Sequence, residues 1–90
     1  MSKYLLSYDY HHERDYKKLY ELLDRWGAKR ILESLWFANL NGTATAGREA
    51  LKSVADADDA FLVIELQEGS DWAHTRGVYK TGSEWLSANL

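Results

Sequence analysis

The apolar residues at the start of the chain alternate along a run that contains no glycine. In residues 3–10 every even position carries Tyr or Leu, and the odd positions also include an apolar side chain. Large side chains on both sides are typical of a strand inside a sheet. From Tyr16 the apolar spacing becomes helical, and Gly27 provides a stop signal. The pattern therefore predicts a central strand over residues 3–10 and a helix over residues 16–26, with Asp15 as its N-cap.

The middle of the chain predicts further strands and a second helix. In residues 28–40, apolar side chains occur at both the odd and the even positions, and the segment contains too many β-forming residues for a helix. They predict either two strands with a bend near residues 34–36 or one long bent strand. Thr43 is placed to cap a helix that runs to about Val54. The near-continuous apolar run over residues 61–66 is typical of a strand covered on both faces.

Residues 67–90 form a tail that follows these predicted strands and helices. We expect a short edge strand at residues 78–80 and a final short helix capped by Ser83. The whole chain, residues 1–90, is then one α+β domain with a ferredoxin-like βαββαβ core over residues 3–66. Its four-stranded antiparallel sheet carries two helices on one face. The other face is left open with large side chains, so we expect a homodimer to form through it.

Composition narrows the function classes. The 90 residues fit one domain, and the absence of cysteine excludes disulfide scaffolds, thiolate metal sites and cysteine nucleophiles. No apolar run approaches the roughly 20 residues of a membrane helix, so we expect a cytoplasmic protein without a membrane contact. The net charge is −3, whereas nucleic-acid binders are usually basic. Any contact with a polyanion is therefore expected at a local patch, in the less acidic half before residue 46.

Asp9 is the first candidate for chemistry, because it ends the first strand on the same side as Ser7. A single Asp at a strand end commonly caps a loop or pairs with an Arg. The functional alternative is that Asp9 residues from two copies share a divalent cation. Mg²⁺ prefers carboxylate oxygens and keeps several waters, so one carboxylate from each copy suffices. Such a cation activates water or stabilises charge at phosphorus.

The loop after Asp9 carries two adjacent histidines and an arginine. Metal ligation by His11 and His12 is disfavoured because zinc sites need ligands spaced on one face, and no thiolate is present. The alternatives are a solvated loop, or a general acid or base, or a phosphate contact, made by one of the two histidines. Arg14 is a candidate phosphate contact.

The aromatic residues divide into two groups. Tyr16, Tyr20 and Trp26 lie on the predicted helical stripe and are expected in the core. Bases can stack on any exposed aromatic ring, although packing in the core or at a dimer interface is the favoured explanation for each ring. The residues to which both alternatives apply are Trp36, Phe37, Trp72 and Trp85.

Several short motifs together resemble the small CRISPR-associated spacer-acquisition endonucleases. The first strand closes with Tyr8-Asp9, and the predicted second strand has a serine before a hydrophobic–aromatic pair. More closely, the chain resembles the divergent SinR-like branch of that family, through the segments SYD, GAKR, ESLW and NGT. The related virulence-associated protein D, a ribonuclease toxin, shares the expected fold. The resemblance covers residues 3–66 and excludes the tail.

The resemblance implies a ferredoxin-like homodimer in which paired Asp9 carboxylates bind Mg²⁺ or Mn²⁺. It implies an endonuclease acting on RNA or DNA, or else a non-catalytic dimeric hub that holds duplex DNA beside a CRISPR integrase. The alternatives are a dimeric adaptor that binds nucleic acid or a protein partner, and a toxin-like relative whose nuclease activity is lost. The first helix departs from the family because it is less rich in arginine. The residues expected to act in catalysis are Asp9, His11 and His12, and those expected to contact substrate are Ser7, Arg14, Ser34 and Phe37.

Overall fold

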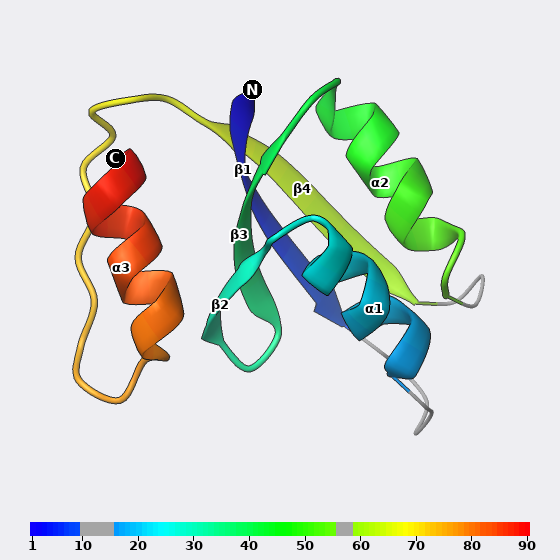
Figure 1. Ribbon diagram of the computed structural model, residues 1–90, viewed down its shortest axis with the longest axis horizontal. Helices are drawn as coiled ribbons and strands as arrows, with labels where there is room; N and C mark the ends of the chain where they lie inside the picture. The colour runs from blue at the N-terminus through cyan, green and yellow to red at the C-terminus, as the bar shows by residue number, and fades with distance from the viewer. Residues whose placement is uncertain (10–15, 56–58) are drawn as a thin grey trace.

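The computed structural model describes residues 1–9, 16–55 and 59–90, and in these it contains a four-stranded sheet and three helices (Figure 1). The strands are antiparallel and follow the order β2-β3-β1-β4. The predicted α+β class is therefore confirmed. The elements are β1 (Ser2–Asp9), α1 (Lys17–Arg25), β2 (Lys29–Leu32), β3 (Leu35–Leu40), α2 (Ala44–Lys52), β4 (Ala60–Leu66) and α3 (Lys80–Asn89). In the described part, no helix is both long and apolar enough to cross a membrane.

β1 lies inside the sheet, as its pattern predicts. It pairs with β3 on one side and β4 on the other, so that Leu5 lies opposite both Phe37 and Ile64. Its even positions are buried under α1 and α2, in a core that also holds Leu19 and Leu23. Alternation along β1 thus assigns each of its side chains to one of two different faces.

The two predicted helices of the first face are confirmed, with differences at their ends. α1 begins at Lys17, and Tyr16 occupies the N-cap position without a side-chain hydrogen bond. The predicted cap Asp15 lies outside the described residues. At the start of α2, the hydroxyl oxygen of Thr43 accepts a hydrogen bond from the backbone N–H of Ala46 at 3.1 Å, as predicted.

Residues 28–40 form two strands and not one long bent strand. β2 and β3 pair as a hairpin, and their register shifts between Arg30 and Leu32. The chain reverses at Glu33 and Ser34, and the carbonyl of Ser34 accepts a hydrogen bond from the backbone N–H of Tyr8 at 3.2 Å. This bond brings the hairpin turn to the end of β1.

The prediction that the fourth strand is covered on both faces is wrong. β4 is an edge strand, and only alternate residues such as Phe61 and Val63 pack towards the first core. Leu62 is 52% exposed and Ile64 is 44% exposed on the opposite face. A run of apolar residues looks the same in a doubly covered strand and in an edge strand, so the pattern alone does not separate them.

The tail differs from its prediction in two ways. Residues 78–80 do not form an edge strand, and α3 begins at Lys80, three positions before the predicted cap Ser83. The backbone N–H of Tyr79 does donate to the carbonyl of Ile31 at 3.0 Å, but the chain then turns into a helix. A second core forms there from Ile31, Phe37, Trp85 and Leu86.

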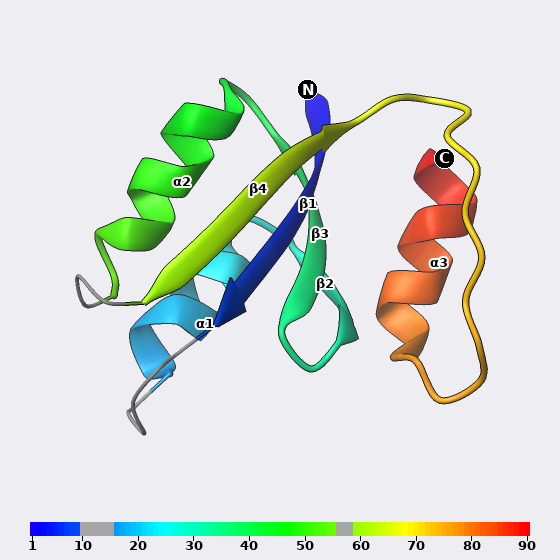
Figure 2. The ribbon, with the colours of Figure 1, turned by 180° about the vertical axis from the view of Figure 1, so that it is seen from behind.

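α3 therefore covers part of the face that was expected to be open. It lies beside β2 and β3 (Figure 2), and Leu5 of β1 and Leu66 of β4 also pack against the second core. Leu62 and Ile64 of β4 remain exposed on this side. Gly82 permits this packing because a Cβ at that position would lie 2.6 Å from Ile31 Cα and 2.5 Å from the carbonyl oxygen of Arg30. We call the uncovered half, which carries Leu62 and Ile64 on β4, the β1–β4 face.

Candidate functional site

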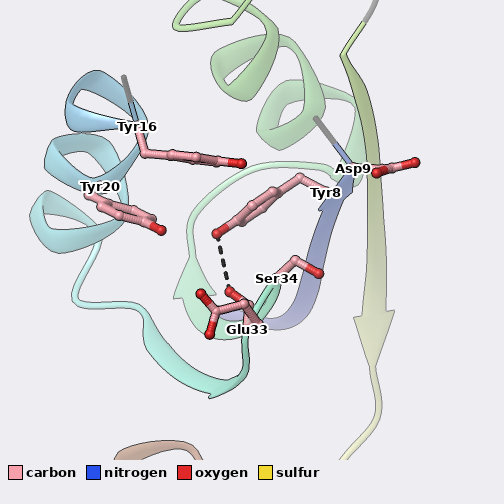
Figure 3. Close-up of a pocket in the computed structure, with 6 residues that line it drawn as sticks. All are labelled: Tyr8, Asp9, Tyr16, Tyr20, Glu33 and Ser34. Carbon is pink, nitrogen blue, oxygen red and sulfur yellow. Dashed lines mark hydrogen bonds between the residues drawn. The ribbon is translucent and has the colours of Figure 1, made fainter. Parts of the chain in front are cut away.

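A pocket of about 210 Å³ lies where β1, the start of α1 and the β2–β3 turn meet (Figure 3). Because the register of the hairpin fixes the turn against the end of β1, residues far apart in the sequence converge here. We call it the tyrosine pocket. Its lining residues are Tyr8, Asp9, Tyr16, Tyr20, Glu33 and Ser34.

Three tyrosines form one wall of the tyrosine pocket. Tyr16 and Tyr20, four residues apart on α1, have stacked rings with centroids 5.6 Å apart, and the Tyr8 ring lies 6.3 Å from that of Tyr16. The Tyr8 hydroxyl donates a hydrogen bond to the carbonyl of Glu33 at 3.4 Å. Burial raises the pKa of Tyr8, so its hydroxyl keeps its proton at neutral pH.

Tyr20 corrects the prediction that the aromatic stripe of α1 is buried. Its side chain is 36% exposed, and Tyr16 and Trp26 are only partly buried against the core. The residues of α1 that are buried are Leu19, Leu22 and Leu23. The buried side of the helix is therefore rotated away from Tyr20, which leaves this ring at the pocket.

Arg30 lies behind the tyrosine pocket among aromatic rings. Its guanidinium carbon is 4.6 Å from the ring centre of Trp36, 5.0 Å from that of Tyr20 and 5.3 Å from that of Tyr79. These are cation–π distances. Burial alone would lower the pKa of Arg30, but the neighbouring hydroxyls of Tyr20 and Tyr8 outweigh it and raise the pKa above its ordinary value. The guanidinium is a fixed positive charge close to two of the tyrosines that line the pocket, Tyr8 and Tyr20.

Glu33 supplies a carboxylate on the opposite wall. Its Oε2 accepts a hydrogen bond from the hydroxyl of Tyr79 at 3.1 Å, and the side chain is exposed to solvent. Tyr79 precedes α3, so this bond ties the pocket to the segment that leads into the third helix. The carboxylate is thereby oriented by a residue 46 positions away in the sequence.

Asp9 lines the same pocket, but its carboxylate points away from the Tyr8 ring and from Glu33 (Figure 3). It is exposed at the end of β1 and pairs with Ala60. By alternation, it shares its face of the sheet with Ser7, which lies opposite Leu62. Asp9 therefore stands between the tyrosine pocket and the β1–β4 face.

The remaining predicted site residues lie in different places. Ser34 lines the tyrosine pocket, whereas Phe37 is 5% exposed and stacks on Trp85 in the second core, with centroids 4.8 Å apart. Phe37 is thus brought together with α3 and not with Asp9. His11, His12 and Arg14 lie outside the described residues, so their roles stay predictions.

The described residues offer few ligands for Mg²⁺ or Mn²⁺ within one chain. Among the residues that the structure describes, no group of three or more His, Asp or Glu side chains is placed to hold a metal ion. An exposed carboxylate such as that of Asp9 is nevertheless a suitable ligand for a hard cation that keeps most of its waters. The residues fit such an ion if two copies of the chain bring two Asp9 side chains together.

The sequence did not indicate Arg30 or Glu33 as residues of the site. It indicated Trp36 only as a ring that either stacks on a base or packs in the core or at a dimer interface. Charged residues are seldom even partly buried, so an arginine whose guanidinium lies between aromatic rings has no signal in the sequence. The one available signal was the turn itself, because a bend at residues 34–36 next to the strand that ends at Asp9 places Glu33 near that end.

No protein-family model matches the chain, and no solved structure matches it.

Proposed function

We propose that this protein acts on nucleic acid as a homodimer and cleaves phosphodiester bonds with a divalent cation held by Asp9 of both copies. The proposal extends the resemblance to the CRISPR-associated endonucleases. The observation that carries it is the position of Asp9, an exposed carboxylate at the end of the central strand, between the tyrosine pocket and the β1–β4 face.

The topology supports a ferredoxin-like arrangement. The strand order β2-β3-β1-β4, with α1 after β1 and α2 after β3, is the order expected for a βαββαβ unit. Both of these helices pack on the same core, formed by the even positions of β1. α3 is then an addition to this unit on its second face.

The β1–β4 face supports the homodimer. Leu62 and Ile64 expose apolar surface there, and Leu5 lies beside Ile64 in the neighbouring strand. In a two-fold dimer the same patch occurs on both partners, so each residue near the axis meets its own copy. Because Asp9 lies at the margin of this face, the two-fold arrangement brings the two carboxylates towards each other.

The chemistry then divides among the residues of the site. The cation supplies an activated water and stabilises negative charge at phosphorus. Asp9 would bind it from the strand end, and Tyr8, whose raised pKa keeps its hydroxyl protonated, donates that proton to the carbonyl of Glu33 and so holds the turn beside Asp9. His11 or His12 moves a proton, and Arg14 contacts the phosphate. Ser7 and Ser34 are hydroxyl donors on the two sides of Asp9.

The test compares Asp9→Asn with Asp24→Asn, an equally conservative change at an exposed position on α1. Labelled single-stranded RNA, single-stranded DNA and duplex DNA are incubated with Mg²⁺, Mn²⁺ or a chelator. We expect the wild type and Asp24→Asn to cleave at least one substrate only with metal. Asp9→Asn should be slower by on the order of 100-fold, because several kcal/mol of stabilisation is lost. Equal cleavage by both variants contradicts the proposal.

A non-catalytic nucleic-acid adaptor is the second candidate, and the Arg30 cluster favours it. Arg30, Tyr20 and Trp36 combine a fixed positive charge with aromatic rings and need no cation to bind a strand. This candidate predicts binding without turnover that is unchanged by chelator. The logarithm of the binding constant should then fall by about 0.7–0.9 per phosphate contact for each unit of log salt.

A further inference from the structure

A second cavity, of about 380 Å³, lies on the face of the sheet that carries α3. Its floor is apolar and includes Leu5, Ile31 and Phe37, and residues 73–78, which lead into α3, form one wall. Figures 1 and 2 show the segment between β4 and α3 running along α3. The volume lies within the ~300–1,000 Å³ of pockets that take small molecules. We call this cavity the apolar pocket.

A histidine and a serine lie together at the apolar pocket. The side chain of His74 lines it, and the Nε2 atom of His74 is 3.0 Å from the Oγ atom of Ser83. Leu86 also lines the pocket and follows Ser83 by three positions on α3, so these two side chains share one side of the helix. His74 is exposed and Ser83 is half-buried, so solvent and a substrate can reach both.

The backbone fixes which nitrogen of His74 carries the proton. Its Nδ1 atom is 2.8 Å from the carbonyl oxygen of Thr75. Because a carbonyl oxygen can only accept a hydrogen bond, Nδ1 carries the hydrogen, and Nε2 of the neutral ring accepts from the Ser83 hydroxyl. The ring of Trp72 is stacked on the imidazole, with centroids 5.8 Å apart. An oriented base in contact with a serine hydroxyl is the arrangement that activates a serine nucleophile.

We propose that Ser83 and His74 form a catalytic pair that hydrolyses carboxylic esters whose acyl chain occupies the apolar pocket. This activity is separate from the proposed action on nucleic acid. It is carried by the contact between Oγ and Nε2, by the carbonyl that orients the base, and by the apolar cavity beside the pair.

The reaction divides into two steps. Ser83 Oγ attacks the ester carbon and its proton passes to Nε2 of His74; the bond to the alcohol oxygen then breaks, and the alcohol leaves with that proton. Water next attacks the acyl-serine and gives a proton to Nε2, which returns it to Ser83 as the carboxylic acid departs. α3 begins three residues before Ser83 without a side-chain cap, so the partial positive charge at its N-terminus stabilises the carbonyl oxygen as it becomes negative.

The test measures the release of p-nitrophenol from p-nitrophenyl acetate and p-nitrophenyl butyrate by the full chain. We expect butyrate to react faster, by about 4-fold for each of its extra methylene groups, which is the effect of burying one such group. Ser83→Ala should reduce both rates to about that of buffer, and His74→Gln should lower them at least about 100-fold, the contribution of a general base. The matched control is Ser87→Ala, at an exposed serine of the same helix, which should keep the wild-type rates. Far-UV circular dichroism establishes that each variant is folded.

A fluorophosphonate gives a readout that a merely structural hydrogen bond would not move. An activated serine forms an Oγ–P bond with this reagent, and the P–F bond breaks to release fluoride. Mass spectrometry of the digested protein should find the label on Ser83 in the wild type and not in His74→Gln.

The outcomes separate this activity from the action on nucleic acid. The catalytic pair is overturned if the wild type hydrolyses neither ester faster than buffer, if Ser83→Ala keeps the wild-type rate, or if Ser83 stays unlabelled. None of these results changes the comparison of Asp9→Asn with Asp24→Asn, so the two proposals stand or fail independently.

Discussion

The two faces of the sheet are built by different means. On the first face, α1 and α2 are each the next element in the sequence after a strand, and they pack on alternate residues of β1. On the second face, α3 is reached only after residues 67–79 and packs on β2 and β3, which lie far back in the sequence. The first face depends on local patterns, and the second depends on a contact between distant segments.

This difference explains which surfaces of the sheet and of α1 are left exposed. One helix of ten residues covers only part of a four-stranded sheet, so the β1–β4 face stays exposed. The tyrosine pocket likewise lies at the end of β1. Tyr20 lines this pocket because its ring is not on the buried side of α1. Both candidate surfaces for function therefore occur where packing is incomplete.

The largest effect is expected from Leu19→Ala on the first face. Leu19 is 0% exposed, and removing its side chain should lower the free energy of unfolding by about 2–5 kcal/mol. Urea denaturation followed by circular dichroism measures it. Leu62→Ala, at a half-exposed leucine of the second face, is the control and should lose much less. Similar losses for the two variants would contradict the proposed difference between the faces.

A smaller and local effect is expected from Gly82→Ala on the second face. The new Cβ meets backbone atoms of Arg30 and Ile31, which do not move as a side chain does, so the strain should be about 1–3 kcal/mol. Hydrogen exchange should become faster in α3 while the amides of α1 keep their protection. The matched control on the same helix is Ser87→Ala, at an exposed position. Uniform loss of protection would show that the two faces unfold together.

The smallest effect on the stability of one chain is expected from Leu62→Lys. A surface substitution changes the free energy of unfolding by only about 0.5 kcal/mol, but a buried charge at the β1–β4 face should dissociate the proposed homodimer. Sedimentation velocity measures the shift to monomer. Leu32→Lys, at a similarly exposed leucine on β2, should leave the dimer intact. A monomeric wild type would remove this face as the dimer interface.

The elements of the first face were predictable from periodicity. β1, α1 and α2 follow periods of two and 3.6, and the cap Thr43 was identified from its residue type. The exposure of β4 was not predictable, because Leu62 and Ile64 have the same pattern in covered and uncovered strands. The earlier start of α3 depends on the fit of Gly82 against β2, which no local pattern records.

The candidate site was predictable only in part. Asp9 and Ser34 were identified from motifs, and both line the tyrosine pocket. Tyr20 was placed in the core because its spacing fits the helical stripe, but Leu22 is buried in place of it. Arg30 and Glu33 reach the site through the hairpin register, which is a long-range property of the sheet.

The edge position of β4 has a consequence for solubility. In the described part of the chain, the outer side of β4 has no neighbouring strand, so its backbone groups can pair with another molecule. The run from Phe61 to Ile64 is apolar, uncharged and free of proline, as in segments that stack into fibrils. Asp59 and Glu65 bracket this run with negative charge. Asp59 is buried, whereas Glu65 is exposed, so Glu65 is the residue whose charge opposes pairing of this strand with another molecule.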